Sequence, residues 1–174
     1  MKSFLVAFAL CLAAALPAWA SNADTEQSNQ HHHEQVYDLP LNDLFRKPDD
    51  GDLVTRTIKL NIIETETGYM LFEPDAIPIN HGSVVRFLIK NGGELDHEFF
   101  LGSFDQVAEH HQWMLKNPDM EHDDPNGISL PSGETVEVVW KFPEMVNLEF
   151  GCLIPGHLEA GMWGVIMVHD HLAH

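Results

Sequence analysis

Three side chains that bind soft metals lie close together near the carboxyl end of the chain. Cys152, His157 and Met162 follow the spacing Cys-x4-His-x4-Met within the stretch EFGCLIPGHLEAGMWGVIMV. Thiolate, imidazole and thioether groups suit copper, and two His with one Cys and a weak axial Met are typical of a type 1 copper site. The spacing predicts three ligands on one loop, which Pro155 and Gly156 allow to turn tightly.

The second histidine of such a site must come from elsewhere in the chain. His97 follows a Gly-Gly turn in NGGELDHEFFLG and begins an apolar run typical of a strand. We therefore expect His97 to approach the loop from a neighbouring strand. Two alternatives remain. Two His and one Cys could bind zinc, although the Met favours copper, and an ordinary loop could bury a thiol and a Met without any metal.

Each predicted ligand has a distinct chemical role. Cys152 binds as a thiolate, and the charge of the metal lowers its pKa far enough for this. The imidazoles of His97 and His157 bind as neutral rings, each through one nitrogen. Met162 binds weakly, and the strength of that bond tunes the reduction potential. We therefore expect one copper ion that cycles between Cu(I) and Cu(II).

The first twenty residues differ from the rest of the chain. Lys2 precedes a charge-free apolar run, and residues 18–20 read Ala-Trp-Ala, the small-residue pattern of a cleavage site. We expect a signal peptide over residues 1–20 and export to the periplasm. Its removal takes away Cys11 and leaves Cys152 as the single thiol. A bound metal would protect that thiol from oxidation.

The composition limits the partners of the chain. It has 9 Lys and Arg against 27 Asp and Glu, a net charge of −18 at pH 7. Loss of Lys2 with the signal peptide would leave −19. Such an acidic chain is a poor partner for nucleic acid or anionic membranes, and no later stretch is apolar enough to span a bilayer. We expect copper ions as the ligand, with a basic redox protein or a copper-handling protein as the candidate protein partner.

Short runs that alternate polar and apolar residues indicate strands from Leu53 onward. The expected strands are TRTIKLNII (55–63), GYMLFEP (68–74), SVVRFLIKN (83–91), the stretch around HEFFLG (97–102), GETVEVVWKF (133–142), VNLEFGC (146–152) and GMWGVIMVH (161–169). About seven short strands with Gly, Pro, Asn and Asp between them predict an all-β Greek-key sandwich. It would occupy residues 51–170, between a polar His-containing leader over 21–50 and a tail over 171–174.

One segment interrupts the strands. Residues 104–117 have Phe104, Val107, His111 and Met114 at helical spacing and end before Pro118, which predicts a helix. It begins an insert over residues 104–127. The candidate accessory copper ligands of this insert are His110, His111, Met114, Met120 and His122. The alternative is a solvated polar helix face followed by a loop.

Further histidines lie in the two tails. They are His31, His32 and His33 in the leader and His169, His171 and His174 at the carboxyl end. We expect only weak binding there, because mobile ligands lose conformational entropy on binding.

On these motifs the chain resembles the cupredoxins. Its Cys-x4-His-x4-Met loop, with an IPGH core and a following Gly-Met, is similar to that of rusticyanin-like members. INHGSVVRFLIKN resembles the strand–turn–strand entry ahead of the first His ligand, and the similarity extends from about Ile77 to Val168. The resemblance implies a Greek-key β-sandwich. The copper ligands that it implies are His97, Cys152, His157 and Met162.

The residue after the first ligand departs from the family pattern. Many cupredoxins have Asn there, where it ties the ligand loops together, whereas this chain has Glu98. We expect different surroundings for the copper, and with them a different potential and colour.

The whole chain looks most like the periplasmic copper-tolerance cupredoxins, which implies copper homeostasis by binding and redox cycling of copper. The alternative is a dedicated electron-transfer shuttle between redox partners. Both use the same chemistry, but a shuttle has little need for a His- and Met-bearing insert. We expect no enzyme activity, since the chain without its predicted signal peptide has neither a second Cys for a thiolate-bridged copper pair nor the His-Cys-His element of multicopper oxidases.

Overall fold

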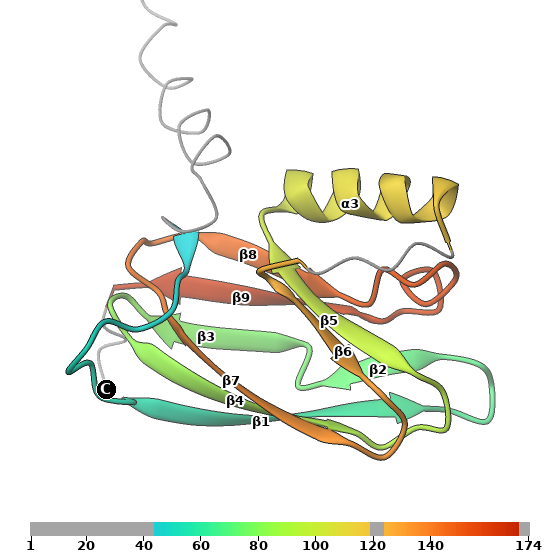
Figure 1. Cartoon of the computed structure of the whole chain (residues 1–174), viewed down its shortest axis with the longest axis horizontal. Coiled ribbons are helices and arrows are strands. Elements are labelled where there is room, and N and C mark those ends of the chain that lie inside the picture. The colour runs from blue at the N-terminus through green and yellow to red at the C-terminus, as the bar shows by residue number, and fades with distance from the viewer. Residues whose placement is uncertain (1–43, 119–123, 171–174) are drawn as a thin grey trace, which may run out of the picture.

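The computed structural model of the chain describes residues 44–118 and 124–170. The predicted signal peptide, the leader up to residue 43, Met120, His122 and the tail over 171–174 lie outside the described residues. The described residues form nine strands and the helix α3 (Figure 1). The elements are β1 (Arg56–Glu64), β2 (Met70–Glu73), β3 (Ala76–Asn80), β4 (Val84–Asn91), β5 (His97–Gly102), α3 (Phe104–Lys116), β6 (Gly127–Leu130), β7 (Thr135–Lys141), β8 (Asn147–Gly151) and β9 (Trp163–His169).

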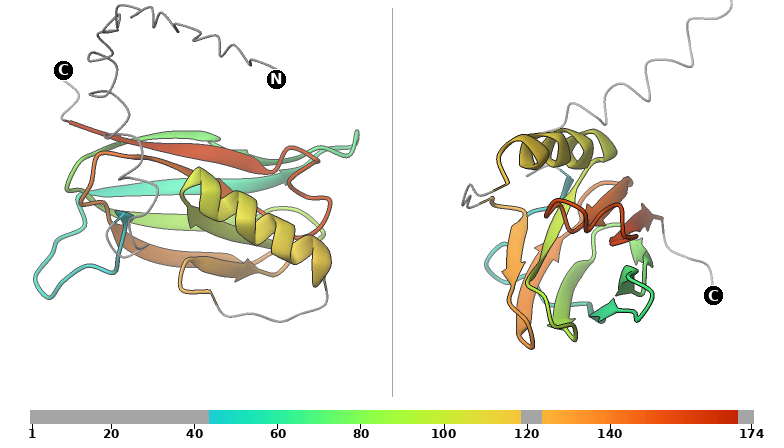
Figure 2. Two further views of the ribbon diagram at one scale, coloured as in Figure 1. Left: turned by 90° about the horizontal axis from the view of Figure 1, so that it is seen from above. Right: turned by 90° about the vertical axis from the view of Figure 1, so that its right-hand side faces the viewer.

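The strands form two sheets that pack face to face (Figure 2). One sheet has the order β2-β1-β4-β7 and the other β3-β9-β8-β5-β6. Two neighbouring pairs, β1 with β4 and β3 with β9, are parallel, so the chain must cross between the sheets to form them. The all-β sandwich predicted from the alternating runs is confirmed.

Aromatic side chains fill the space between the sheets. Phe99 on β5 is fully buried and stacks on Phe150 of β8, with ring centroids 5.2 Å apart. It also stacks on Trp140 of β7 at 6.0 Å and meets Phe72 of β2 edge to face at 5.8 Å. These contacts connect both sheets through the strand that begins with His97. The core therefore holds that strand in place.

Two edge strands were not among those predicted. β3 contains Pro78, which weakens a strand pattern because proline cannot donate a ladder hydrogen bond. At the edge of a sheet this loss is tolerated. β6 has only 4 residues, too few to show an alternating pattern, and it begins at Gly127, where the predicted insert ends.

The predicted helix is present as α3, which begins directly after its cap, Ser103. The Ser103 hydroxyl accepts the backbone N–H of Gln106, and the Gln106 side chain accepts the backbone N–H of Ser103. This reciprocal pair satisfies two donors at the start of the helix. Figure 1 shows α3 lying above β8 and β5, outside the sandwich.

The helix is attached to the second sheet by a small apolar cluster of its own. Val107 and Met114 of α3 are buried there with Phe100 of β5 and Leu153, and Leu158 packs against them. Leu153 and Leu158 belong to the segment that follows Cys152. The helix therefore supports the segment predicted to bind metal.

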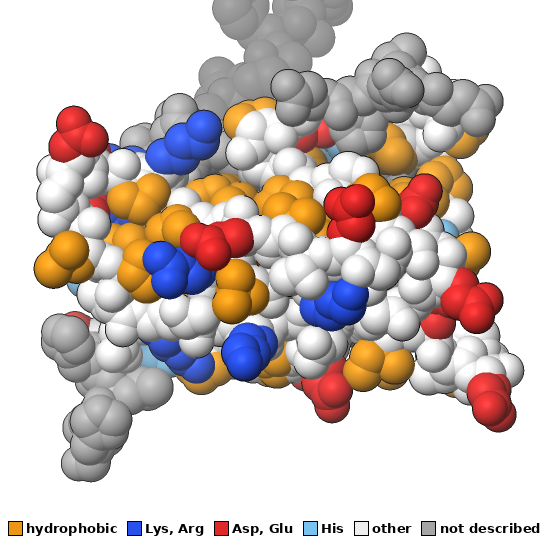
Figure 3. Space-filling model, turned by 60° about the horizontal axis from the view of Figure 1, so that its bottom comes forward, with side chains coloured by type: hydrophobic (Ala, Val, Ile, Leu, Met, Phe, Trp, Pro, Cys, Tyr) orange, Lys and Arg blue, Asp and Glu red, His pale blue; other side chains and the backbone are white. Residues whose placement is uncertain are grey.

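The outer surface of the first sheet carries both basic and acidic side chains. Lys59 of β1 and Lys90 of β4 are exposed there, and Arg86 of β4 pairs with Glu137 of β7. Figure 3 views the molecule from this side and shows Lys and Arg side chains spread over the face, with Asp, Glu and apolar side chains between them. No helix within the described residues is long and apolar enough to cross a membrane.

Truncation of Phe99 tests the role of the aromatic core. Phe99→Ala removes a fully buried ring with several aromatic neighbours, so the free energy of unfolding should fall by about 3–5 kcal/mol. Urea unfolding followed by circular dichroism measures this. Leu53→Ala is the control, because Leu53 is 80% exposed and should change the value by less than about 0.5 kcal/mol. Equal effects of both changes would contradict the packing described.

Candidate metal centre

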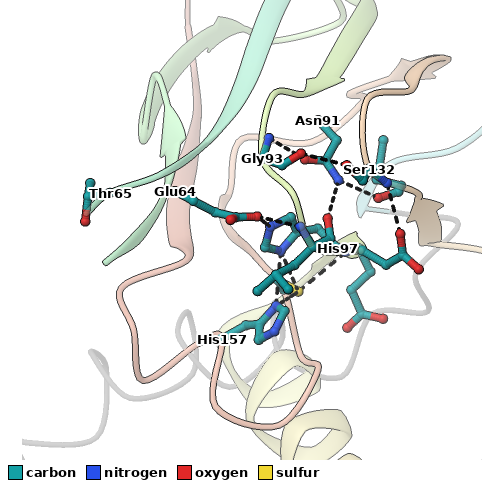
Figure 4. A network of polar contacts seen from close by, with 12 residues as sticks. Glu64, Thr65, Asn91, Gly93, His97, Ser132 and His157 are labelled. Atoms are coloured by element: carbon teal, nitrogen blue, oxygen red, sulfur yellow. Dashed lines mark hydrogen bonds and ion pairs between the residues drawn. The ribbon is translucent and has the colours of Figure 1, made fainter. Parts of the chain in front are cut away.

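A thiol and two imidazoles meet at one end of the second sheet. His97 is the first residue of β5, while Cys152 and His157 lie in the segment between β8 and β9. The Cys152 Sγ lies 3.3 Å from His157 Nδ1 and 4.0 Å from His97 Nδ1, and the two Nδ1 atoms are 3.1 Å apart. Figure 4 shows both rings directed toward the sulfur. Within the described residues, this is the one group of three or more His, Cys, Asp or Glu whose ligand atoms all lie within 4.8 Å of one another.

Sheet pairing explains why residues so far apart in the sequence meet. β5 and β8 are antiparallel neighbours, with Phe100 opposite Gly151. The start of β5 and the end of β8 therefore lie side by side, which brings His97 close to Cys152. His97 and Cys152 are both buried, whereas His157 is partly exposed.

Local turns then bring His157 back onto Cys152. The backbone N–H of His157 donates to the Ile154 carbonyl at 3.0 Å, and the intervening Gly156 has a φ of +93°. A positive φ strains residues with a side chain, so this position requires glycine. The tight turn predicted from Pro155 and Gly156 is therefore present in the structure.

Met162 closes the same segment. Its carbonyl accepts the backbone N–H of Cys152 at 3.0 Å, and its own N–H donates to the His157 carbonyl at 3.1 Å. The Met162 side chain is fully buried. These bonds hold Met162 beside two of the three clustered residues, and its role as a fourth ligand stays a prediction.

Glu98 ties the two ligand-bearing segments together. Its carboxylate oxygen Oε1 accepts the backbone N–H of Leu153 at 2.6 Å, and its own backbone N–H donates to Cys152 Sγ at 3.4 Å. The family pattern assigns a similar tie to Asn at this position. Here a carboxylate makes the connection, so the sulfur has an acidic side chain beside it.

A second carboxylate, which was not among the predicted site residues, contacts the centre. Glu64, the last residue of β1, places Oε1 3.0 Å from His97 Nε2. The backbone N–H of Leu95 donates to the same oxygen at 2.9 Å. This hydrogen bond lowers the pKa of Glu64, and the contact with His97 lowers it further against the opposing effect of burial.

Asn91 holds the turn that leads to His97. Its side-chain Nδ2 donates to the carbonyls of Leu95 and Leu130, both at 2.8 Å, and its Oδ1 accepts the Gly93 N–H at 2.9 Å. Ser132 adds a hydrogen bond from its hydroxyl to the Gly93 carbonyl at 2.8 Å. Figure 4 shows this network between the end of β4 and the site. The turn before β5 is therefore held in place by the side chains of Asn91 and Ser132.

The alternation of inward and outward residues in β1 and β4 could have identified Glu64 and Asn91, because both fall at core-facing positions. In β1, Ile58, Leu60 and Ile62 face the core, so the next inward position is Glu64. In β4 the buried Phe87 and Ile89 are followed at the same spacing by Asn91. A polar residue in the core-facing phase needs a buried partner. Because β1 and β4 run parallel with Ile62 opposite Asn91, the two polar residues lie at the same end of the sandwich.

Without a metal, the surroundings of Cys152 and His157 disfavour the charged form of each side chain. Burial raises the pKa of Cys152 to about 12. Burial also lowers the pKa of His157, and the neighbouring His97 lowers it further. The centre therefore offers a neutral imidazole at neutral pH, together with a thiol that must lose its proton to bind a metal.

The predicted accessory residues lie apart from this centre. His110 Nε2 is 3.4 Å from Asp124 Oδ2, and its ring stacks on Phe100 with centroids 4.5 Å apart. His111 Nε2 is 3.2 Å from Glu159 Oε1. Met114 lies in the apolar cluster under α3. The two described histidines thus face different carboxylates.

The donor set itself fits copper. A thiol and two imidazole nitrogens, all close enough to share one ion, suit a soft to intermediate metal. The buried thioether of Met162 follows five residues after His157. Because His97 and Cys152 are held by hydrogen bonds, the positions of the ligand atoms would change little between Cu(I) and Cu(II).

Solved structures with a similar fold include two auracyanins. Auracyanin from Roseiflexus castenholzii superposes with a TM-score of 0.55 at 20% identity, covering 69% of this chain and 100% of that protein. Auracyanin A from Chloroflexus aurantiacus, a blue copper protein, gives 0.52 at 24% identity over 65% and 98% of the two chains. These likenesses show the cupredoxin fold. No established protein-family profile matches the chain.

Curated proteins similar in sequence share one name. The copper-resistant cuproprotein CopI of Rubrivivax gelatinosus is 36% identical over 168 residues, which cover 97% of this chain and 99% of that protein. Its namesake from Pseudomonas aeruginosa is 35% identical over 153 residues, covering 71% and 82% of the two chains. With such identity along almost the whole length, the chain belongs to the CopI family of copper-resistant cuproproteins.

Proposed function

We propose that this protein binds one copper ion in a type 1 site and acts in copper tolerance by binding and redox cycling of copper. The ligands of the site are His97, Cys152, His157 and Met162. The observation that supports this most directly is the convergence of two imidazole nitrogens and a thiol within 4.8 Å at the end of a cupredoxin sandwich. The names of the related proteins support the role in tolerance.

The protein's own residues prepare the ligands for the ion. Copper would supply reversible one-electron chemistry, and the Cys152 thiol would release its proton to water on binding it. The Glu98 N–H donates to the sulfur and stabilises the thiolate. His97 and Cys152 are buried, so water is kept from the sulfur, whereas the partly exposed His157 is the ligand nearest to solvent.

The insert favours tolerance over a dedicated electron shuttle. A shuttle requires the four-ligand site and a docking surface, whereas α3 adds imidazoles on its own face beside Asp124 and Glu159. Imidazole and carboxylate oxygens are both metal ligands. The accessory set of His110, His111, Met114, Met120 and His122 is therefore proposed to capture further copper. A role in binding, without enzyme activity, agrees with this assignment.

The cellular setting is proposed from the sequence. A cleavable signal peptide over residues 1–20 would export the chain to the periplasm, where Cys152 would be its single thiol. A copper ion held by that thiol would protect it in an oxidising compartment.

Substitution of the thiol tests the central assignment. Cys152→Ser should abolish the thiolate-to-copper absorption band, because the hydroxyl is a poor copper ligand and leaves only two imidazoles and a thioether. Visible absorption and electron spin resonance of the copper-loaded protein measure this. His81→Gln, at an exposed turn, is the control and should retain the band. A coloured band that survives Cys152→Ser would contradict the assignment.

Copper uptake should release about one proton per ion at neutral pH. The pKa of Cys152 is raised to about 12, so the free thiol is protonated, while the lowered pKa of His157 keeps that ring neutral. Copper affinity should therefore increase with pH, about tenfold per unit through the neutral range, because one proton competes with the metal. A pH indicator in weakly buffered solution counts the protons. The same measurement on Cys152→Ser should give almost none.

The copper stoichiometry tests the accessory residues. The processed protein should bind more than one copper ion per chain at equilibrium dialysis. The triple variant His110→Gln, His111→Gln, His122→Gln should lose the additional ions and keep the coloured one. His81→Gln again serves as the control. A stoichiometry of one in the unaltered protein would refute accessory capture and favour the electron shuttle.

A further inference from the structure

The Glu64 carboxylate contacts the His97 ring on the edge opposite the other ligands. Its Oε1 lies 3.0 Å from His97 Nε2, while His97 Nδ1 faces His157 and the thiol (Figure 4). An ionised carboxylate only accepts hydrogen bonds, so the ring must carry its proton on Nε2. The Nδ1 atom is then left with a lone pair directed into the cluster. This contact therefore selects the tautomer that can bind a metal through Nδ1.

The position of Glu64 is built by the surrounding backbone. The Leu95 N–H donates to the same oxygen that accepts from His97, which fixes the carboxylate at the end of β1. Gly93 leaves room for it, because a Cβ at that residue would collide with the Glu64 carboxylate. Asn91 and Ser132 hold Gly93 in turn. Four residues from two parts of the chain, 91–95 and Ser132, thus maintain one contact to His97.

Burial makes the charge of Glu64 effective. The His97 side chain is 0% exposed and that of Glu64 only 22%. A negative charge separated from the ion by one imidazole ring is weakly screened in such surroundings. It attracts Cu(II) more strongly than Cu(I), since the oxidised ion has the greater positive charge.

We propose that Glu64 is a positioning residue of the copper site, which orients His97 Nδ1 toward the metal and stabilises Cu(II) relative to Cu(I). This inference rests on the proposed type 1 site. It adds a determinant of the redox balance that is not itself a ligand. A tolerance protein that retains the oxidised ion would gain from such a carboxylate.

Two substitutions at Glu64 separate orientation from charge. Glu64→Gln keeps an oxygen that accepts from His97 and Leu95 but removes the charge. The ratio of Cu(II) to Cu(I) affinity should fall on the order of tenfold, which corresponds to a potential higher by about 59 mV for one electron. Glu64→Ala removes the acceptor as well, so the absorption band should also shift. Voltammetry and visible absorption of the full-length copper protein measure both effects.

A second readout does not depend on copper. Nitrogen NMR of the metal-free protein should show His97 protonated on Nε2 in the unaltered protein and in Glu64→Gln, and a mixture of tautomers in Glu64→Ala. Gly93→Ala should displace the carboxylate and reproduce the mixture. Glu137→Gln is the control, because Glu137 is exposed on β7 and paired with Arg86. It should leave the potential and the tautomer unchanged.

The outcomes distinguish the two levels of the proposal. An unaltered protein without a thiolate-to-copper band would overturn the type 1 site and the inference with it. An unaltered protein with the band, but with potential and His97 tautomer unaffected by both changes at Glu64, would overturn the inference alone. A potential that rises equally in Glu137→Gln would also overturn it, because the effect would then be one of overall charge.

Discussion

Burial of a single thiol is the physical constraint on which the arrangement of this protein depends. Cys152 is fully buried, and its pKa of about 12 means that the free thiol stays neutral in the core. Binding of a metal there would release this proton, and other ligands already in place would make the exchange more favourable. The imidazoles of His97 and His157 meet this condition, since their Nδ1 atoms lie within 4.0 Å of the sulfur.

The sandwich provides this geometry through backbone pairing. The antiparallel pair β5 and β8 places His97 beside Cys152, and the parallel pair β1 and β4 ends at the same site with Glu64 and Asn91. Phe99, two residues into β5, is held by rings from both sheets. Movement of His97 would therefore disturb the aromatic core. Such rigidity suits a centre that changes oxidation state with little change in geometry.

Two carboxylates give the centre an acidic character. Glu98 accepts the Leu153 N–H where the family pattern has an amide side chain, and Glu64 accepts from the far nitrogen of His97. Each makes a hydrogen bond that a neutral residue could also make, and each adds negative charge near the sulfur or the imidazole. Beside α3 the same pairing of His with Asp or Glu recurs, with His110 half-buried and His111 buried. Carboxylates therefore attract cations both at the centre and beside the helix of the insert.

The sequence by itself determined the residue types that meet at the centre, the strand-rich fold and the helix. The Cys-x4-His-x4-Met spacing lies on one short segment, so local turns bring Cys152 and His157 together, and glycine at residue 156 is readable without a structure. Periodicity likewise identified α3, because a helix is a local pattern. Strands β3 and β6 escaped detection, one through Pro78 and the other through its length of 4 residues.

Only the tertiary structure decided what surrounds the ligands. The contact of Glu64 with His97 joins the ends of two strands in different sheets, and no spacing in the chain specifies which carboxylate will reach which imidazole. The same is true of Met114, since its helical spacing does not specify that it packs with Phe100 and Leu153. Local sequence patterns specify residues that are neighbours along the chain. Contacts between distant segments depend on how the two sheets and the helix pack.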